Sequence, residues 1–589
     1  MKEVLSYKKK LKLLRNLLKK KDCNYYLLPR TDKFQNEFIL EKDERVKWLT
    51  GFSGSFAFVI ISLKQNIIFT DGRYIDQIKK EVDQKTFKIL DINNKEPILW
   101  LRDKIQEKEK VLLDSWLFSC NKFNYLKKII KEKKSKILLS KEILIDKIWK
   151  KKTNKTINKI FIRETKYSGI FFKNKIQHVK KILKDKKINS FFFSSPESIS
   201  WLLNIRSNQI KYVPIVLSFL LLNLNEKSYF FSKKNKNLEK YFSSYFIIFD
   251  LQDLREILIN FSITNKEIYL DPNKTPYFIE NFFKTIGVKV KYSQDPCENL
   301  KLIKNPIEIK GFKSSHIRDG VSVCKFLFWL DEIIKKNKKI SEIITSKKLF
   351  EFRKKNKLFR GLSFETISSF GSNGSIIHYR VSTKTNKILK KNNLYLHDSG
   401  AQYLDGTTDM TRTICIGDNP TQEQKDRFTR VLKGNLGLSN CSFSNRTTGS
   451  VLDKIARRHL KKKKLDYPHG TGHGVGSYLS VHEGPISISK SSKTKFKKGM
   501  VLTNEPGFYK TNQYGIRIEN ILLVIKKKKL LGFEILTLVP IDIKLIDTRL
   551  LNIQEKNWLN IYHKKVFNKI FKYLNKKERK WLKEKTAPI

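Results

Sequence analysis

The chain has 589 residues, 40% of them hydrophobic and 12% aromatic, which is enough for about three to four domains with sizeable cores. Its net charge of +63 comes from 120 lysines and arginines against 57 acidic residues. Because the lysines are scattered along the whole chain, we attribute them to compositional bias and expect no specific nucleic-acid partner. The six cysteines include no CxxC pair, which argues against a disulfide framework and a cysteine-based zinc site.

The first 303 residues are predicted to form two α/β domains of similar construction, residues 1–155 and 156–303. In each, an amphipathic helical pattern precedes an apolar strand: a basic helix comes before NYYLLPR, and KNKIQHVKKILKDKKI comes before NSFFF. The lysine- and asparagine-rich WKKKTNKTINK near residue 150 is interpreted as the linker between the two domains.

This region predicts no membrane segment. The longest apolar stretch, IVLSFLLL at residues 215–222, is too short to cross a bilayer and is predicted to be a buried strand. The N-terminus has no apolar core of the kind found in secretory signals. We therefore expect a cytoplasmic protein with no membrane partner.

The third region, residues 304–589, opens on a strong helix signal. Asn305 suits the N-cap, Pro306 the first helical position, and Glu308 the capping-box position three residues after Asn305. A second helical segment, SEIITSKKLFEFRKK, comes next, and strand-rich segments and two further helical segments follow it. The last helical patterns, beginning at NWLNIYHKK, are predicted to form a C-terminal extension.

The stretch HDSGAQYLDGTTDMTRT sets two aspartates on a predicted hairpin. Its strands are expected at 394–403 and 407–416, with Asp405-Gly406 providing turn chemistry. In that register Asp398 lies opposite Asp409, and like charges directly across a ladder destabilise it. Something positive is therefore expected between them: an arginine, a shared proton or a metal ion.

Histidines and glutamates in distinctive contexts follow the hairpin. The histidines are His378 in IIHY, His469 and His473 in PHGTGHG, and His482 in VHEGP. The glycines around His469 and His473 exclude an ordinary helix and let the backbone bend closely around a ligand. The glutamates are Glu505 in TNEPGFY and Glu519 in GIRIEN, where Arg517 shares the strand face of Glu519.

Four carboxylates and one imidazole from these motifs are predicted to converge: Asp398, Asp409, His473, Glu505 and Glu519. Four carboxylates meeting at one place need cations, and two divalent ions would balance their charge. A site rich in carboxylates and free of thiolates favours Mn²⁺ over a structural Zn²⁺. Two such ions can hold a hydroxide between them and polarise a carbonyl group.

The ordered motifs DSG, TTDMTRT, HGTGHGVG, VHEGP, EPGFY and GIRIEN resemble those of the M24 metallopeptidase family, which has a pita-bread catalytic domain. The chain is most similar to the cytosolic, three-domain Xaa-Pro aminopeptidases (aminopeptidase P). The resemblance extends to DERVKWLTGFSGS and TDGRY in the first domain and to WLLNIRSNQIKYVPIVLSFLLL in the second. It implies two creatinase-like α/β domains ahead of the catalytic domain.

The resemblance also implies a role for each ligand. Asp398 would hold one metal ion, and Asp409 and Glu519 would bridge both. His473 and Glu505 would complete the second ion's ligands, and Glu505 is also a candidate proton acceptor for the attacking water.

Three more histidines and one arginine match residues that bind no metal in the family. His378, His469 and His482 would position the substrate, stabilise the developing oxyanion and move protons. Arg517 would be the partner of a bridging carboxylate. His397 stands where the family usually has an aliphatic residue, and strand alternation points it away from the site, so we expect either a packing role or an unusual hydrogen bond.

The implied reaction is hydrolysis of the first peptide bond of peptides with proline in the second position, by a homodimeric enzyme. Two other peptidases on the same fold, prolidase and methionine aminopeptidase, remain alternatives that the ligands alone do not separate. The long N-terminal region favours the Xaa-Pro aminopeptidase. A non-catalytic pita-bread binding module is a further alternative, which the complete ligand set argues against.

Overall fold

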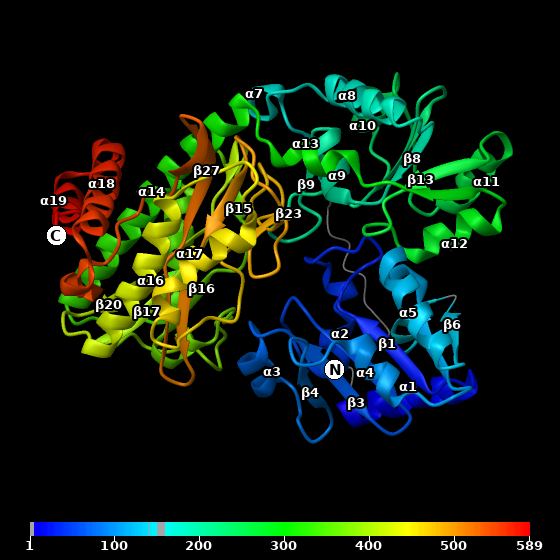
Figure 1. Cartoon of the computed structure of the whole chain (residues 1–589), viewed down its shortest axis with the longest axis horizontal. Helices are drawn as coiled ribbons and strands as arrows, with labels where there is room; N and C mark the ends of the chain where they lie inside the picture. The colour runs from blue at the N-terminus through cyan, green and yellow to red at the C-terminus, as the bar shows by residue number, and fades with distance from the viewer. Residues whose placement is uncertain (1–4, 141, 150–158) are drawn as a thin grey trace. The chain divides into compact units, whose positions relative to one another are not determined.

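The computed structural model describes residues 5–140, 142–149 and 159–589 (Figure 1). The predicted linker near residue 150 falls largely within 150–158, outside the described residues. The chain forms two compact units. The first comprises Met1–Ile162 and Phe171–Cys297, and the second comprises Arg163–Ile170 and Glu298–Ile589.

The first unit holds two six-stranded sheets of the same topology. The first sheet has the order β4-β3-β2-β1-β5-β6. Its strands are β1 Tyr25–Pro29, β2 Phe58–Ser62, β3 Asn66–Thr70, β4 Lys88–Asp91, β5 Lys110–Asp114 and β6 Lys136–Ser140. Its helices are α1 Tyr7–Lys20, α2 Arg45–Thr50, α3 Ile75–Glu81, α4 Pro97–Lys104, α5 Cys120–Glu132 and α6 Leu144–Ile148.

The second sheet repeats that plan with the order β12-β11-β10-β8-β13-β14. Its strands are β8 Ser190–Phe193, β10 Phe219–Asn223, β11 Ser228–Phe231, β12 Phe246–Phe249, β13 Glu267–Leu270 and β14 Lys289–Tyr292. Its helices are α8 Phe172–Asp185, α9 Pro196–Leu202, α10 Lys236–Phe242, α11 Leu254–Thr264 and α12 Tyr277–Thr285.

Antiparallel and parallel strand pairs occupy the same places in the two sheets. The pairs β1–β2 and β2–β3 of the first sheet are antiparallel, as are β8–β10 and β10–β11 of the second. The pair β1–β5 is parallel, as is β8–β13. The prediction of two similar α/β domains is confirmed, although the boundaries at 155 and 303 stay predictions. The apolar run at 215–222 supplies β10, which is buried throughout.

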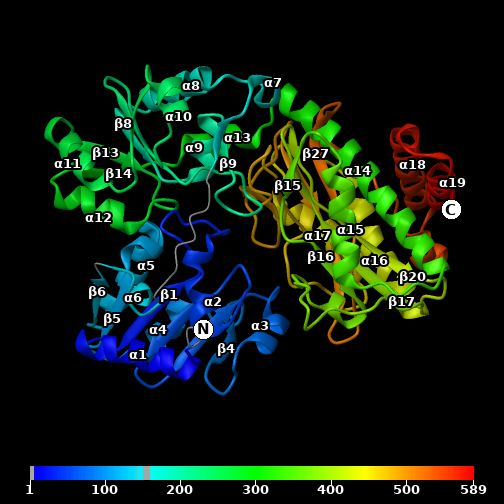
Figure 2. The ribbon, with the colours of Figure 1, turned by 180° about the vertical axis from the view of Figure 1, so that it is seen from behind.

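The two sheets of the first unit are joined by backbone and ring contacts between α5 and α12, which lie side by side in both views (Figure 2). Ser119 and Pro276 form an isolated β-bridge. The N–H of Cys120 donates to the carbonyl of Thr275 over 2.9 Å. The ring of Tyr277 stacks on Phe123 with centroids 3.5 Å apart, so a residue of the second domain completes the first domain's core.

The second unit is built around α14 Pro306–Lys335, which begins as predicted. Asn305 is its N-cap, and Asn305 and Glu308 form a complete capping box. The other helices are α7 Thr165–Ser168, α13 Pro296–Leu302, α15 Glu342–Lys354, α16 Gln422–Asn440, α17 Gly449–Lys461, α18 Ile553–Ile570 and α19 Lys576–Lys585. The last two form the predicted C-terminal extension.

Among the described residues, the strands of the second unit form three small sheets and one of six strands, β21-β28-β27-β24-β22-β23. A further pair, β7 Ile160–Ile162 and β9 Ile205–Ser207, belongs to the first unit. The first strands of the second unit are β15 Phe359–Leu362, β16 Ile367–Phe370, β17 Asn393–Ser399, β18 Ala401–Tyr403, β19 Gly406–Thr407, β20 Met410–Ile416 and β21 Ser442–Phe443. The remaining ones are β22 Gly472–Gly474, β23 Glu483–Ile488, β24 Val501–Asn504, β25 Gly507–Lys510, β26 Tyr514–Arg517, β27 Asn520–Lys527 and β28 Leu530–Ile535.

Of these sheets, β16-β17-β20 and β25-β26 meet the six-stranded sheet where the candidate site residues lie. Glu519, next to β27, donates its N–H to the Thr411 carbonyl on β20, and Ile518 donates to Pro506, next to β25.

The hairpin of HDSGAQYLDGTTDMTRT forms, but its predicted register is wrong by two residues. Asp398 on β17 pairs with Thr411 on β20 rather than with Asp409. The turn falls on Leu404-Asp405, because Gly406 already pairs with Tyr403. Gly406 serves close packing rather than the turn: a Cβ there would lie 2.6 Å from the Ser315 hydroxyl on α14. A shift of two keeps every side chain on its predicted face, so both aspartates still face the same side.

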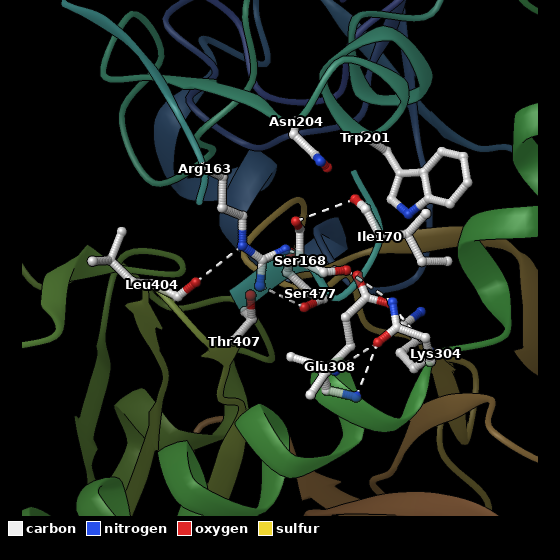
Figure 3. A network of polar contacts seen from close by, with 12 residues as sticks. Arg163, Ser168, Ile170, Trp201, Asn204, Lys304, Glu308, Leu404, Thr407 and Ser477 are labelled. Atoms are coloured by element: carbon white, nitrogen blue, oxygen red, sulfur yellow. Dashed lines mark hydrogen bonds and ion pairs between the residues drawn. The ribbon is translucent and has the colours of Figure 1, made fainter. Parts of the chain in front are cut away.

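The short segment Arg163–Ile170 is tied into the second unit through one buried guanidinium (Figure 3). Arg163 donates to the Leu404 carbonyl over 3.0 Å and to the carbonyl and hydroxyl of Ser477 over 2.8 and 2.9 Å. The Glu308 carboxylate lies 3.8 Å away. Arg163 therefore fastens together the turn of the hairpin and the loop that follows β22.

Candidate metal centre

Three of the predicted ligands form a compact group. Asp409, His473 and Glu519 can each offer one ligand atom, and these atoms lie within 4.8 Å of one another. Asp409 directly precedes β20, His473 is on β22, and Glu519 lies between β26 and β27. The single strand predicted for GIRIEN is thus interrupted at Ile518–Glu519.

The other two predicted ligands border this group. The Glu505 carboxylate, just beyond β24, is 3.7 Å from His473 Nε2, and Asp409 is 3.6 Å from the same nitrogen. Asp398 accepts a 2.6 Å hydrogen bond from Arg517 Nη2. Backbone hydrogen bonds tie the strand ends together here, since the N–H of Glu505 donates to Thr471 and that of Glu519 to Thr411.

The carboxylates of this site are held in an environment that opposes their charge. Asp398, Asp409 and Glu519 are 7%, 4% and 2% exposed. Burial raises the pKa of Asp398, and it raises the pKa of Asp409 and Glu519 well above the usual range with added repulsion from the neighbouring carboxylates. Burial, joined at Asp409 and Glu519 by repulsion from neighbouring carboxylates, therefore opposes full ionisation of the group in the absence of cations.

The donor set fits divalent metal ions. Carboxylate oxygens and one imidazole converge from five separate places in the chain, and oxygen-rich sites of this kind suit hard or borderline divalent cations. One acceptor is left over: Asp398 Oδ1 is buried and makes no hydrogen bond within the part of the chain that the structure describes. An oxygen in that condition is suited to coordinate a cation.

Arg517 links several residues of the site, although not as the sequence predicted. It contacts Asp398 rather than one of the residues predicted to bridge two ions. Its Nε donates to the Thr411 hydroxyl over 3.1 Å, and that hydroxyl donates to Glu519 over 2.8 Å. Its Nη1 donates to the Tyr509 hydroxyl over 2.6 Å. Arg517 thus reaches Glu519 only through Thr411.

Of the three histidines predicted not to bind metal, His469 and His482 contact residues of this site. The His482 ring meets the His473 ring edge-on with centroids 4.4 Å apart. His469 Nε2 lies 2.9 Å from the Tyr509 hydroxyl, and therefore one residue away from Arg517. His378 is partly exposed, and the carbonyl of the preceding Ile377 lies 3.5 Å from Arg517 Nη2.

Two residues of this network, Tyr509 and Thr411, were not identified from the sequence. Both stand inside quoted motifs, EPGFY and TTDMTRT, and strand alternation was the available signal. On β25, Tyr509 occupies the same face as Gly507. Burial raises the pKa of Tyr509 to about 12, so its hydroxyl keeps its proton and can both accept from Arg517 and contact His469.

Models of known protein families match nearly the whole chain. Residues 10–145 and 151–308 each match a Creatinase/Prolidase N-terminal domain. Residues 312–526 match metallopeptidase family M24, and residues 529–589 match the C-terminal region of peptidase M24.

Relatives that match over their whole length identify the group within this metallopeptidase family. Xaa-Pro aminopeptidase 1 of Dictyostelium discoideum is 38% identical over 609 residues, which cover 99% of this chain and 96% of that protein. The chain belongs to the Xaa-Pro aminopeptidases of metallopeptidase family M24. Aminopeptidase P1 of Lotus japonicus is 33% identical and covers 96% of both chains. The crystal structure of X-prolyl aminopeptidase from Caenorhabditis elegans, described as a cytosolic enzyme with a di-nuclear active site, has a TM-score of 0.94 and 31% identity over 99% of this chain and 100% of that chain.

Membership in this family gives the architecture its name. The two matched sheets of the first unit are creatinase-type N-terminal domains, and the second unit holds a pita-bread metallopeptidase domain with a C-terminal extension, as predicted. No helix among the described residues is both long and apolar enough to span a membrane.

His397, the residue that departs from the family pattern, packs in the interior. It is 2% exposed, and its ring lies 5.1 Å from the ring of Phe326 on α14. Burial lowers its pKa to about 3, so it is neutral in the folded protein. The expected packing role is confirmed.

Proposed function

We propose that this protein is a metal-dependent aminopeptidase that releases the N-terminal residue from peptides with proline in the second position. The observation that carries the proposal is the group formed by Asp409, His473 and Glu519, bordered by Asp398 and Glu505, in a chain related to Xaa-Pro aminopeptidases over nearly its whole length. Proline removes the N–H and restricts φ at the second position, which excludes most peptidases that bind an extended strand there.

The five carboxylate and imidazole side chains would hold two divalent ions, with Mn²⁺ favoured by the oxygen-rich donor set. Asp398 would hold one ion, Asp409 and Glu519 would bridge both, and His473 and Glu505 would complete the second. When bound, such a pair of ions lowers the pKa of water and polarises the scissile carbonyl.

The protein's own residues supply the remaining chemistry. Glu505, the more exposed of the acidic residues with 19% of its side chain accessible, is suited to accept the proton of the attacking water. His482, next to His473, is suited to hydrogen-bond the carbonyl oxygen as negative charge develops on it. His378 and His469 would position the substrate and move protons, with His469 oriented by Tyr509.

Arg517 would orient the site rather than react. Its guanidinium fixes Asp398 directly and Glu519 through Thr411, which sets the direction of two ligands before any ion binds. We also propose that the protein is a cytoplasmic homodimer, as the family resemblance implies.

Of the alternatives on this fold, a prolidase and a methionine aminopeptidase would act on other substrates, and a binding module would catalyse no reaction. A binding module has no need for three buried carboxylates. Burial raises the pKa of all three, and repulsion from neighbouring carboxylates adds to this at Asp409 and Glu519, so the arrangement is costly without cations. A prolidase would cleave dipeptides ending in proline, and a methionine aminopeptidase would not require proline.

The test uses the full-length protein, loaded with Mn²⁺ or treated with a chelator, on Arg-Pro-Pro, Arg-Ala-Ala and a Xaa-Pro dipeptide. We expect release of arginine from Arg-Pro-Pro only in the metal-loaded protein and with a clear preference over Arg-Ala-Ala. Better cleavage of the dipeptide would support a prolidase. Equal activity after chelation, with metal content confirmed to be zero, would overturn the metal-dependent mechanism.

A further inference from the structure

The loop that carries His378 is gathered around one buried carboxylate. Glu342, the first residue of α15, is 0% exposed. Its Oε1 accepts from the Phe370 N–H over 2.6 Å and from Asn373 Nδ2 over 3.0 Å. Its Oε2 accepts from the Tyr379 hydroxyl over 3.0 Å and from the Lys387 N–H over 2.9 Å.

These four donors bracket His378 in the sequence. Two lie before it, at positions 370 and 373, and two lie after it, at 379 and 387. The contacts therefore fix both arms of the loop to one point at the start of α15. The N–H of Glu342 also donates to the Lys387 carbonyl over 3.0 Å, which closes the loop a second time.

His378 itself lies between two held neighbours. The Tyr379 side chain bonds to Glu342, while the Ile377 carbonyl lies 3.5 Å from Arg517, which in turn holds Asp398. Ile376 and Tyr379 also pack in a small apolar cluster with Ile367 and Leu396, next to the metal-site strand β17. The backbone at 377–379 is thus positioned from the site on one side and from Glu342 on the other.

From this geometry we infer that Glu342 is a positioning residue that acts through His378, setting where its imidazole stands relative to the bound peptide. The inference rests on the proposed function, because it takes His378 to contact the substrate. Only a carboxylate satisfies all four donors, since it accepts at both oxygens. A glutamine would turn its N–H₂ group either towards the Phe370 and Asn373 N–H donors or towards the Lys387 N–H and the Tyr379 hydroxyl, and an aspartate would be shorter by one methylene.

The test is a double-mutant cycle with Glu342→Gln and His378→Ala, measured as kcat/KM on Arg-Pro-Pro together with metal content. Glu342→Gln is expected to lower kcat/KM about 10- to 100-fold, because a small misplacement of a positioning group costs that much, while metal content stays that of the wild type. Added to His378→Ala, it is expected to cause less than about a twofold further loss.

The matched control is Asp542→Asn, which removes another buried carboxylate of the second unit that accepts from two backbone N–H groups, those of Cys415 and Lys544. Its effect is expected to multiply with that of His378→Ala. Full multiplication of the Glu342→Gln and His378→Ala losses, or loss of metal in Glu342→Gln, would refute the inference. If Glu342→Gln does not fold, Tyr379→Phe removes a single donor and is expected to show the same lack of additivity with a smaller loss.

Hydrogen–deuterium exchange separates this inference from the proposed function. Glu342→Gln is expected to increase exchange in residues 371–387 without increasing it in 469–482, whatever the substrate is. Unchanged exchange in 371–387 would overturn the positioning role even in an active enzyme. Faster exchange there in Glu342→Gln, together with a wild-type protein that is inactive on Arg-Pro-Pro, would instead leave the holding role intact and refute the proposed function.

Discussion

Arg517 donates a 2.6 Å hydrogen bond to Asp398 from a position that is almost completely buried. The positive group that the hairpin sequence predicted is therefore an arginine for Asp398. Asp409 lies two residues before Thr411, the residue that pairs with Asp398, and is close to His473. The same guanidinium holds Tyr509 and Thr411, so its planar fork distributes one charge over three partners.

Arg517→Lys tests the need for that fork. Lysine keeps the charge but cannot hold three partners in one plane, so we expect kcat/KM on Arg-Pro-Pro and metal affinity each to fall about 10- to 100-fold. A Mn²⁺ titration of activity measures both. Arg446→Lys, at an exposed position in the same unit, is the control and should change neither. Wild-type metal affinity in Arg517→Lys would show that the fork does not orient the ligands.

Asp409→Asn is expected to abolish metal binding at one position and nearly all activity while the fold persists. Because burial and neighbouring carboxylates raise the pKa of Asp409, a neutral asparagine removes repulsion in the metal-free protein. The thermal midpoint of the chelated variant should therefore equal or exceed that of the chelated wild type. Asp405→Asn, in the turn of the same hairpin, is the matched control for activity. Full turnover by Asp409→Asn would rule out its role as a bridging ligand.

His482→Ala separates chemistry from metal binding. The side chain neighbours His473 but is proposed to act on the substrate, so metal content should stay unchanged while kcat falls about 10²- to 10³-fold. Elemental analysis and steady-state kinetics on a Xaa-Pro-Xaa tripeptide provide the two measurements. His178→Ala, an exposed histidine on α8, should have no effect on either. Loss of metal in His482→Ala would reassign His482 as a ligand.

Arg163→Met is expected to destabilise the second unit by about 3 kcal/mol, because it leaves the Glu308 carboxylate and the Leu404 and Ser477 carbonyls buried with fewer partners. Urea unfolding provides the measurement, with Arg446→Met as the exposed control. Stability equal to that of the control would show that the three hydrogen bonds of Arg163 contribute nothing net.

His563 gives the second unit a defined dependence of stability on pH. It is 0% exposed, accepts the Ile541 N–H at Nε2, and burial lowers its pKa to about 4. Between about pH 6.5 and 4 the unfolded chain binds a proton that the folded protein refuses, so stability is present above pH 6.5 and is lost as the pH falls. The loss from this residue between pH 7 and 5 is about 2 kcal/mol.

His563→Gln removes the titratable imidazole, while the glutamine side chain still offers an oxygen to the Ile541 N–H. Urea unfolding at pH 7 and 5 should show a smaller difference for the variant than for the wild type, and His178→Gln should leave the difference unchanged. An identical pH dependence in His563→Gln and wild type would contradict the lowered pKa.

Features set by neighbouring residues were predictable from the sequence. The capping box of Asn305 and Glu308 involves residues three apart, and it forms as expected. The hairpin was also recognisable, but its register was not. Asp405-Gly406 has the composition of a turn, whereas Gly406 is required where the backbone of β19 packs against Ser315 of α14. That contact joins positions about ninety residues apart, which no local pattern reveals.

In the candidate site, too, features carried by short motifs were predictable from the sequence, whereas features that depend on distant contacts were not. Its acidic and histidine residues stand in distinctive short motifs, so they could be picked out singly, and the structure brings Asp409, His473 and Glu519 together. Glu342 could not be found in this way, because a glutamate at the first turn of a helix is an ordinary feature of helix starts. Its four partners lie 28 to 45 residues further along the chain.

The strand bridge between Ser119 and Pro276 has a mechanical consequence for the N-terminal half of the protein. Because Tyr277 completes a core that belongs to the other sheet, pulling the sheets apart would expose apolar surface on both. The two sheets should therefore unfold in a single transition. After a protease cut in the chain between them, the two fragments should co-elute in size-exclusion chromatography.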